Sequence, residues 1–398
     1  MANAAQAKLQ NTMAVLKQVQ QHPGISRPEI GQACLLSPST VQGITQQLEK
    51  CEIIESSGLA FSNGGRKAQC YQLNKQRYRV VSVNIRINKL EVGILNLGLE
   101  VLARTEQAMD ISSAGPETYV AVVAGFIRGQ IEQSGTPFED LLAIGVSIPG
   151  PANFETGAVQ QLIRAPQWEG FPFGPRLARE MGLPVFVDKD AYCGVRYLEY
   201  NGQVQNGRSV AYVSVRNGIS AALLIDGQVF RGGHSLAGEI GHITVRRDGL
   251  PCPCGNTGCL ELYCSDLGIV SQYNALAGTN HKNVNSIIAL AGQNDEVAQR
   301  VFSQAVTYLV ETTTSLIMNY DPDEIWVNCT WLEKQRGLYF KMLDILYAKS
   351  VFTRKHNVDV RLLEEQEFYL HAGGALAASA QLFSPGSRLH RAIAETNL

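Results

Sequence analysis

The sequence has no apolar run near the roughly 18 residues that a membrane-spanning helix needs. It also shows no recognisable secretory segment, no low-complexity stretch and no Ser/Gly-rich linker. Charged residues make up 18% of the chain and hydrophobic ones 45%, which are ordinary proportions for a globular protein. These absences exclude membrane-spanning proteins and disulfide-framed secreted domains. We therefore expect a cytoplasmic protein that does not insert into a membrane.

The charge of the chain is unevenly distributed along its 398 residues. Residues 1–78 contain eight Lys/Arg and four Asp/Glu, a net charge of +4, whereas the remainder holds 26 and 32, a net charge of −6. This length predicts two or three domains. A small basic domain on an acidic body predicts a nucleic-acid contact that is confined to the N-terminal domain.

Three of the nine cysteines lie in one short stretch, 238–261, together with a histidine and two glutamates. The residues of interest there are Glu239, His242, Cys252, Cys254, Cys259 and Glu261. Three thiolates and one imidazole complete a closed, four-coordinate structural zinc site, so we predict His242, Cys252, Cys254 and Cys259 as its ligands. The metal would act as scaffolding and would hold the two carboxylates beside a small polar ligand.

Other interpretations of this stretch remain possible at the level of sequence. Disulfides are disfavoured because cytosolic thiols stay reduced. A catalytic zinc needs an open coordination position, and the predicted set fills all four. Chance clustering is a third possibility, and Cys264 is a spare thiol that could compete as a ligand.

Apolar periodicity predicts three helices at the N-terminus, over residues 6–20, 26–34 and from Ser37 onward. The third helix buries one apolar stripe and presents small and amide side chains on its opposite face. These candidate DNA-reading residues are Ser39, Thr40, Gln42, Gly43, Gln46 and Gln47. Such side chains near a helix N-terminus can approach base edges in the major groove.

Two extended segments then flank Asn63-Gly64-Gly65 and are followed by Arg66 and Lys67. This pattern predicts a β-hairpin wing whose basic pair reaches phosphate or the minor groove. Three helices and a wing make a winged helix-turn-helix. The alternative is a trihelical module that mediates only protein contacts.

From residue 79 the pattern changes to alternating strands and helices. Two successive β-β-β-α-β-α units predict two related α/β lobes with a cleft between them. We assign residues 1–78 to the DNA-binding domain, 79–189 with 371–398 to the first lobe, and 190–370 to the second lobe. A closing helix at about 372–382 is expected to cross back to the first lobe.

With these features in place, the chain resembles the ROK family over nearly its whole length, and in particular its NagC/XylR-type repressors. The family's zinc signature, E-x-G-H, nine residues, then C-x-C-G-x-x-G-C-x-E, occurs from Glu239 to Glu261 without a gap. The segment 145–151 is similar to the family's G-x-x-x-P-G-P loop, and the head and wing are similar to those of the repressor branch, which the kinases lack. The resemblance implies actin-like, ribonuclease-H-like α/β lobes behind the winged helix-turn-helix.

The resemblance also implies a sugar site at Asp190, Glu239, His242 and Glu261, since carboxylates accept paired hydrogen bonds from adjacent hydroxyls. Lys189 stands where the kinases have an Asn before their catalytic Asp. This cation would suit a phosphorylated or acidic sugar; alternatively, it neutralises Asp190 or points into solvent.

Three segments that bind phosphate and metal in the ROK kinases differ here. The hairpin 84–88 has no carboxylate, glycine or hydroxyl, the loop 216–220 keeps one glycine of three, and the segment 328–330 has no Gly-Gly. Phosphoryl transfer depends on positioning phosphates and their metal. The resemblance therefore implies a protein that is not an enzyme and has no ATP and no catalytic residues.

We thus expect a repressor, homodimeric or tetrameric, that binds a palindromic operator and responds to a sugar or sugar phosphate between its lobes. One alternative is a ROK sugar kinase that has acquired a DNA-binding head. Another is a repressor whose body docks a protein of sugar transport.

Overall fold

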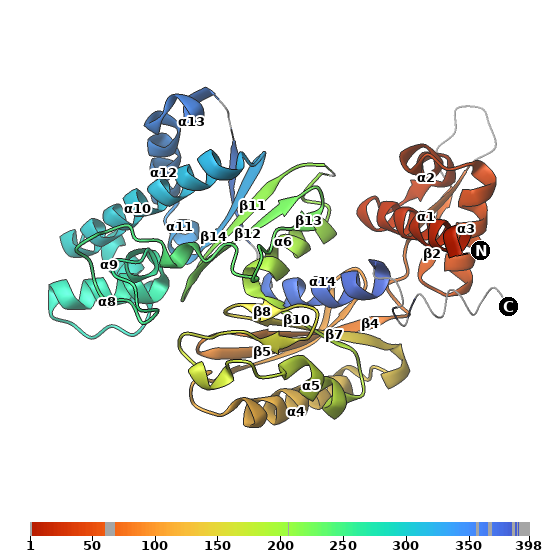
Figure 1. Ribbon diagram of the computed structural model, residues 1–398, viewed down its shortest axis with the longest axis horizontal. Helices are drawn as coiled ribbons and strands as arrows, with labels where there is room; N and C mark the ends of the chain where they lie inside the picture. Colours follow the sequence, from red (N-terminus) through yellow and green to blue (C-terminus); the bar gives the residue numbers. More distant parts are fainter. Residues whose placement is uncertain are drawn as a thin grey trace.

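The fold was analysed in a computed structural model that describes residues 2–59, 68–205, 207–355, 358–364 and 368–383, together with residues 387 and 389 (Figure 1). No helix within these ranges is long and apolar enough to cross a membrane. The chain forms a small N-terminal head and a larger body of two sheets.

The head is a winged helix-turn-helix, as predicted. Its elements are α1 (Ala2–Gln21), β1 (Ile25–Ser26), α2 (Arg27–Cys34), α3 (Pro38–Lys50), β2 (Ile54–Leu59) and β3 (Gln69–Leu73). The predicted helix starts are confirmed: Ser26 forms a capping box with Glu29, and the Ser37 hydroxyl accepts a hydrogen bond from Thr40 N at 3.2 Å. The two wing strands β2 and β3 pair antiparallel. The tip of the wing, including Arg66 and Lys67, lies outside the described residues.

The first lobe is a five-stranded mixed sheet with helices on both faces. Its strands are β4 (Arg79–Ile85), β5 (Lys89–Asn96), β6 (Val101–Ala108), β7 (Leu141–Ile148) and β10 (Val185–Lys189), in the order β10-β7-β4-β5-β6. β10, β7 and β4 run parallel, and β4, β5 and β6 antiparallel. The helices α4 (Pro116–Ser134) and α5 (Phe173–Met181) cover one face.

The second lobe repeats this plan, which confirms the two related units. Its strands are β11 (Val210–Val215), β12 (Ile219–Ile225), β13 (Gln228–Val229), β14 (Glu324–Cys329) and β15 (Asp359–Leu362), in the order β13-β12-β11-β14-β15. Its main helices are α8 (Asp266–Ala277), α9 (Val284–Gly292), α10 (Glu296–Tyr320) and α12 (Arg336–Lys349). The strand β15 and the helices α11 (Thr330–Lys334), α12 and α13 (Val351–Lys355) were not predicted from the sequence.

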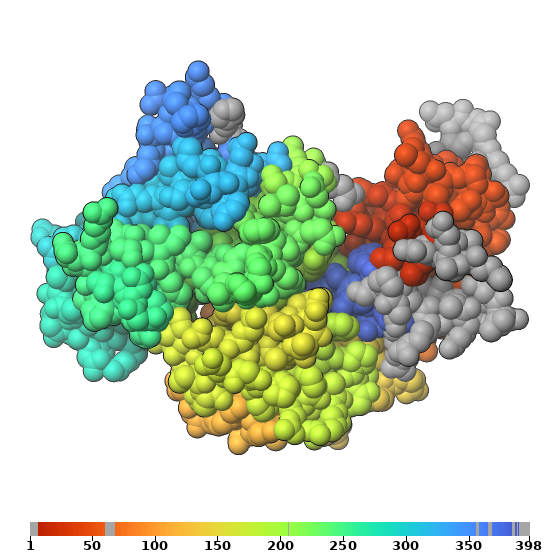
Figure 2. Space-filling view, in the orientation of Figure 1, coloured from red at the N-terminus to blue at the C-terminus, as the bar shows by residue number. Residues whose placement is uncertain are grey.

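Two helices lie between the lobes. α14 (Phe368–Phe383) packs on β4 and β7 of the first sheet, and α6 (Asp190–Tyr200) packs on β11 and β12 of the second sheet and on α14. α14 approaches the first sheet closely at glycines, since a Cβ on Gly145 would lie only 2.0 Å from Gly373 O. α1 of the head contacts α14, and the head lies against the body beside this helix (Figure 2). The domain limits given above stay a prediction.

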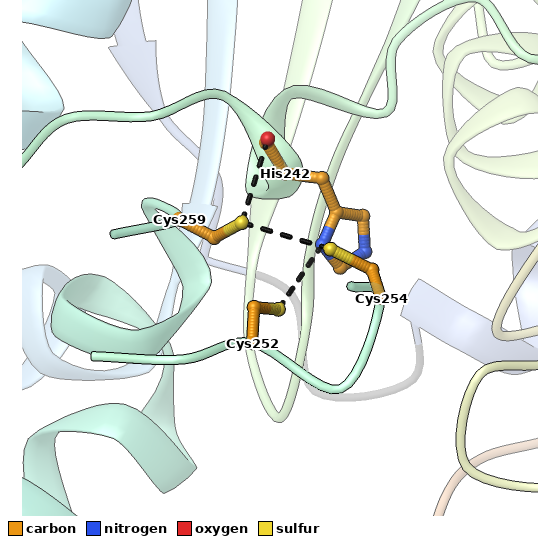
Figure 3. Close-up of side chains that lie close together, drawn as sticks. All are labelled: His242, Cys252, Cys254 and Cys259. Carbon is orange, nitrogen blue, oxygen red and sulfur yellow. Dashed lines mark hydrogen bonds between the residues drawn. The ribbon is translucent and has the colours of Figure 1, made fainter. Parts of the chain in front are cut away.

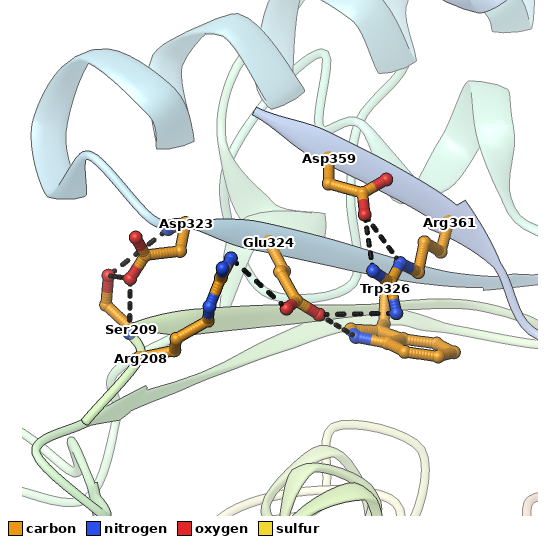
Figure 4. A network of polar contacts seen from close by, with 7 residues as sticks. All are labelled: Arg208, Ser209, Asp323, Glu324, Trp326, Asp359 and Arg361. Carbon is orange, nitrogen blue, oxygen red and sulfur yellow. Dashed lines mark hydrogen bonds and ion pairs between the residues drawn. The ribbon is translucent and has the colours of Figure 1, made fainter. Parts of the chain in front are cut away.

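A polar network ties the edge strand of the second sheet to its neighbour (Figure 4). Only 4% of the Glu324 side chain is exposed, and its Oε1 lies 3.5 Å from Arg208 Nη1. Trp326 Nε1 donates to Glu324 Oε2 at 3.1 Å. Arg361 of β15 lies 3.7 Å from the same oxygen and stacks over the Trp326 ring. A buried carboxylate is thus compensated by two cations and one neutral donor.

Candidate functional site

One histidine and three cysteines of the second lobe come together in the chain segment between β13 and α8 (Figure 3). The ligand atoms of His242, Cys252, Cys254 and Cys259 all lie within 4.8 Å of one another. Cys252 Sγ is 3.7 Å from His242 Nδ1, and Cys254 Sγ is 3.7 Å from Cys259 Sγ. Tetrahedral bonds of about 2.3 Å to sulfur and about 2.0 Å to nitrogen place neighbouring donors ~3.5 Å apart. These side chains could therefore hold one metal ion.

The loop around the cysteines reaches this geometry through two glycines. Gly255 and Gly258 adopt φ of 93° and 72°, and a Cβ on Gly258 would lie 1.7 Å from Arg246 O. Cys252 N donates to Asn256 O at 2.8 Å and closes the turn. Cys264 lies apart from the cluster, because its buried thiol donates to Ala305 O at 3.3 Å. It is therefore not a competing ligand.

Two of the three thiols in the cluster have a raised pKa, whereas the pKa of Cys254 is lowered, because hydrogen bonds from the Asn256 backbone and from the other two cysteines outweigh its burial. Burial, together with its neighbours Cys252 and Cys254, raises the pKa of Cys259 to about 12. Burial also raises the pKa of Cys252. A metal ion that binds here must displace the protons of these thiols.

A cavity of about 550 Å³ lies next to the cysteine cluster, and residues of both lobes line it. The four predicted sugar ligands, Asp190, Glu239, His242 and Glu261, all line this one cavity. The loop that follows β7 contributes Pro149, Gly150 and Pro151 from the first lobe. The structure therefore brings together residues that lie up to 112 positions apart in the sequence.

The cavity carboxylates are anchored by the protein on one side. Asp190 Oδ1 accepts from Ala191 N at 2.7 Å and from Ser220 Oγ at 3.2 Å. Glu261 Oε2 accepts from Ile219 N at 3.2 Å. Burial raises the pKa of Asp190, and the charge of Lys189 offsets part of this increase. Burial also raises the pKa of Glu261, and the charge of His242 offsets part of that increase.

Lys189 is buried, and the prediction that it could point into solvent is wrong. Its side chain is 1% exposed, and Nζ lies 2.5 Å from Glu239 Oε1. Nζ also donates to Ala237 O at 3.2 Å and lies over the Tyr192 ring. The cation thus pairs mainly with Glu239 across the lobes, and its charge also lowers the pKa of Asp190.

The prediction from sequence missed a cation and an aromatic residue of this cavity. Arg164 Nη2 lies 4.0 Å from Glu261 Oε1, and Arg86 stacks over the ring of Tyr369 at 4.6 Å. Both arginines and Tyr369 line the cavity. No motif marks Arg164, whose only signal is its place shortly after the segment that resembles the P-G-P loop. Tyr369 lies in the first turn of α14, whose predicted start at residue 372 was too late.

The three segments that stand where the ROK kinases have phosphate loops are joined by hydrogen bonds, and two of them line the cavity through Arg86 and residues 216–220. Asn217 Nδ2 donates to Asn88 Oδ1 at 3.0 Å, which joins the first segment to the second. Arg216 donates to Asn328 Oδ1 at 2.7 Å and to Thr330 Oγ1 at 2.6 Å, which joins the second to the third. The largely buried guanidinium of Arg216 therefore links the second and third segments.

The candidate DNA-reading residues lie on one face of α3. Ser39, Gln42, Gly43 and Gln46 are exposed, while Val41, Ile44 and Leu48 of the opposite face are buried. Thr40 is half-buried and accepts or donates a hydrogen bond to the Ser37 hydroxyl at 2.8 Å.

Comparison with known proteins agrees with this architecture. Residues 80–381 match the ROK family, and residues 9–55 match the family described as winged helix-turn-helix DNA-binding. A xylose repressor from Bacillus subtilis is 26% identical over 319 residues, covering 79% of this chain and 80% of its own. The DNA-binding transcriptional dual regulator NagC from Escherichia coli is 25% identical over 331 residues, covering 81% of each.

A solved structure, described as a ROK family transcriptional regulator and homologue of the E. coli MLC protein, superposes with a TM-score of 0.81. Its identity is 25%, and the match covers 98% of this chain and 99% of that chain. ROK kinases share the fold at lower identity: a glucokinase from Streptomyces griseus solved with glucose and AMPPNP is 21% identical, with a TM-score of 0.65 over 75% of this chain and 98% of that chain.

A winged helix-turn-helix head on a two-lobed α/β body defines a transcription regulator rather than an enzyme. The relatives that cover more than nine tenths of this chain, and so include the head, are a putative xylose repressor and a transcriptional regulator by name. The chain belongs to the ROK family.

Proposed function

We propose that this protein is a transcriptional repressor of genes for sugar metabolism or transport, controlled by a sugar or sugar phosphate bound between its lobes. The observation that carries the proposal is the convergence of Asp190, Glu239, His242 and Glu261 on one cavity in a chain that also carries a winged helix-turn-helix head. The names of two relatives, a xylose repressor and an N-acetylglucosamine repressor, support a sugar as the effector. A repressor of this kind works in the cytoplasm.

The sugar would be held mainly by carboxylates. Each ionised carboxylate can accept hydrogen bonds from two neighbouring hydroxyls, which suits a polyol better than an apolar ligand. Asp190 and Glu261 are already anchored by backbone or hydroxyl donors, so their remaining acceptor sites face the ligand at little entropic cost. His242 would contribute its second ring nitrogen.

The metal in this proposal is a structural zinc held by His242, Cys252, Cys254 and Cys259. Three thiolates and one imidazole fill a tetrahedral shell, which leaves no open position for catalysis. The ion would fix His242 and the loop that leads into Glu261, and so would hold the sugar site in shape.

No ATP is expected in this proposal, and the protein would not phosphorylate its ligand. Arg216 lies among the segments that correspond to the kinase phosphate loops, and its donors are already engaged by Asn328 and Thr330. These segments have no carboxylate that could position a magnesium ion. Asp190 could then not act as a catalytic base, because no phosphoryl group would lie in place for a sugar hydroxyl to attack.

The DNA site would be Ser39, Thr40, Gln42, Gly43 and Gln46 of α3 in the major groove, with Arg66 and Lys67 of the wing on the backbone or in the minor groove. A palindromic operator would require two heads, so the active form is a homodimer or a dimer of dimers.

Isothermal titration calorimetry with a panel of sugars and their 6-phosphates tests the proposal. The panel contains xylose, glucose and N-acetylglucosamine, and the protein is zinc-loaded. We expect one member to bind with a one-to-one stoichiometry, and Glu239→Ala to abolish the heat. Binding of MgATP with turnover of a sugar would contradict it, and so would capture by a sugar-transport protein with no sugar binding at all.

A further inference from the structure

Helix α6 reaches from the cavity to the DNA-binding head. Its first residue, Asp190, lines the cavity, and its last residue, Tyr200, touches α1. The helix has 11 residues, which corresponds to about 16 Å of rigid rod. Most of its side chains are buried, so it cannot bend or rotate without displacing the packing of both lobes.

The N-terminal end of α6 is tied to the second lobe by polar contacts at the cavity. Asp190 accepts from Ser220 of β12 at 3.2 Å, and the Tyr192 hydroxyl donates to Ala237 O at 2.8 Å. The preceding Lys189 pairs with Glu239 and donates to the same Ala237 carbonyl. A ligand whose hydroxyls donate hydrogen bonds to Asp190 or Glu239 must compete with these contacts, so it acts directly on the start of the helix.

The C-terminal end of α6 is tied to the head. Lys17 of α1 pairs with Glu199 at 3.0 Å, and the Gln20 side chain donates to Tyr200 O. Glu199 is held in place by Arg196 at 2.5 Å, and the Tyr200 hydroxyl donates to Leu97 O at 2.7 Å.

Apolar packing reinforces this junction. The buried residues Val15, Leu16 and Val19 of α1 belong to the same hydrophobic cluster as Tyr197 and Tyr200. The head is therefore seated on α6 by side-chain contacts and not only by the chain that follows β3.

We propose that α6 transmits occupancy of the cavity to the head, and that Lys17 and Gln20 are the positioning residues that receive it. The inference rests on the proposed function, because it assigns the route by which a sugar changes DNA binding. A displacement of Asp190 moves Glu199 and Tyr200 with it, since all three lie on one rigid helix. That movement shifts α1 and with it the placement of α3 on DNA. Sugar binding and DNA binding are coupled in this way if α6 can take two positions and the sugar binds more tightly to one of them.

The test uses a double variant on the head, Lys17→Met with Gln20→Met, in the full-length protein. Neither residue lies in the cavity or on the DNA-reading face of α3, and methionine keeps the length of both side chains. The control is Lys75→Met, which breaks another ion pair, with Glu100 at 2.7 Å, between the segment after β3 and the first lobe, away from α6. The DNA is a duplex selected in vitro on the wild-type protein, and the sugar is the member of the calorimetric panel that binds.

Three quantities are measured for each protein: sugar affinity, DNA affinity, and the change in DNA affinity at saturating sugar. In the wild type and in Lys75→Met the sugar should change DNA affinity at least about fivefold, as allosteric coupling does in general. In the double variant we expect the sugar affinity to stay within about threefold while the sugar effect on DNA falls below about twofold.

A double variant that responds to sugar as strongly as the wild type would overturn the role of α6 and leave the proposed function intact. A wild type that binds DNA but responds to no sugar would overturn the proposed function, and the route with it. A loss of response in Lys75→Met as well as in the double variant would show that any loosening of the head abolishes control, which also contradicts a specific route through α6.

Discussion

Lys189 Nζ lies 2.5 Å from Glu239 Oε1, and this ion pair of a buried lysine joins the last strand of the first lobe to the loop before the cysteine cluster of the second. The pair places a cation among three carboxylates that line the cavity. A sugar that uses Glu239 must share this carboxylate with the lysine.

Lys189→Met should therefore destabilise the protein, because it leaves the half-buried Asp190 and Glu239 without their nearest cation. Glu239 is partly exposed, so we expect the free energy of unfolding to fall by about 1–3 kcal/mol, not by the full cost of a deeply buried pair. Chemical denaturation at pH 7 measures it. Adding Glu239→Gln to the variant should recover part of the loss, and a Lys189→Met protein as stable as the wild type would show that the pair contributes nothing.

Cys254→Ser should remove the metal and loosen the cavity at the same time. Losing a ligand that binds only the folded state costs about 3 kcal/mol when the ligand is at 100 times its Kd. Zinc content by mass spectrometry and the melting temperature measure the two effects. Cys34→Ser, which changes a cysteine of the head, is the control and should keep one zinc per chain. A metal-free Cys254→Ser protein with unchanged stability and sugar response would refute a structural role for the ion.

Sugar affinity should fall as the pH is lowered from 8 to 5. Only the ionised carboxylates of Asp190 and Glu261 accept two hydrogen bonds from hydroxyls, and protonation replaces an acceptor by a donor. Because burial raises the pKa of both groups, protonation and loss of affinity begin at a higher pH than for ordinary carboxyls. Calorimetry at constant ionic strength gives the profile. An affinity that is flat or rises toward pH 5 would mean that these groups do not hold the ligand as carboxylates.

Gln46→Ala and Arg66→Ala should weaken DNA binding in different ways. The first should cost about 1–3 kcal/mol and relax the sequence preference at one base position. The second should weaken binding to all sequences alike. It should also reduce the slope of the logarithm of DNA affinity against the logarithm of salt concentration by about one, because one phosphate contact is lost. Anisotropy titrations at several salt concentrations separate the two. Gln293→Ala, on an exposed turn of the second lobe, is the control and should leave both quantities unchanged.

Local signals explain why much of the fold was predictable. The limits of α8 follow from local signals that are visible in the sequence, because Ser265 caps its start with a hydrogen bond from Gly268 N at 2.9 Å and Gly278 ends it with φ of 66°. The cysteine cluster was equally visible, since its spacing encodes its geometry.

What escaped prediction depends on contacts between distant parts of the chain. β15 has four residues and buries little of itself, so only its pairing with β14 makes it a strand. The burial of Lys189 depends on Glu239 and Ala237 from the other lobe. α12 is different, because its buried residues Tyr339, Met342 and Leu346 have helical spacing that could have been recognised.

The central claim is that one ligand in the cavity changes DNA affinity through Glu239 and its neighbours. The most direct measurement is an anisotropy titration of labelled operator DNA with wild type and Glu239→Ala, each with and without the sugar that binds in calorimetry. The account predicts a change of at least about fivefold in the wild type and none in Glu239→Ala, which should still bind DNA. Equal responses of the two proteins, or a wild type that binds sugar and DNA independently, would contradict it.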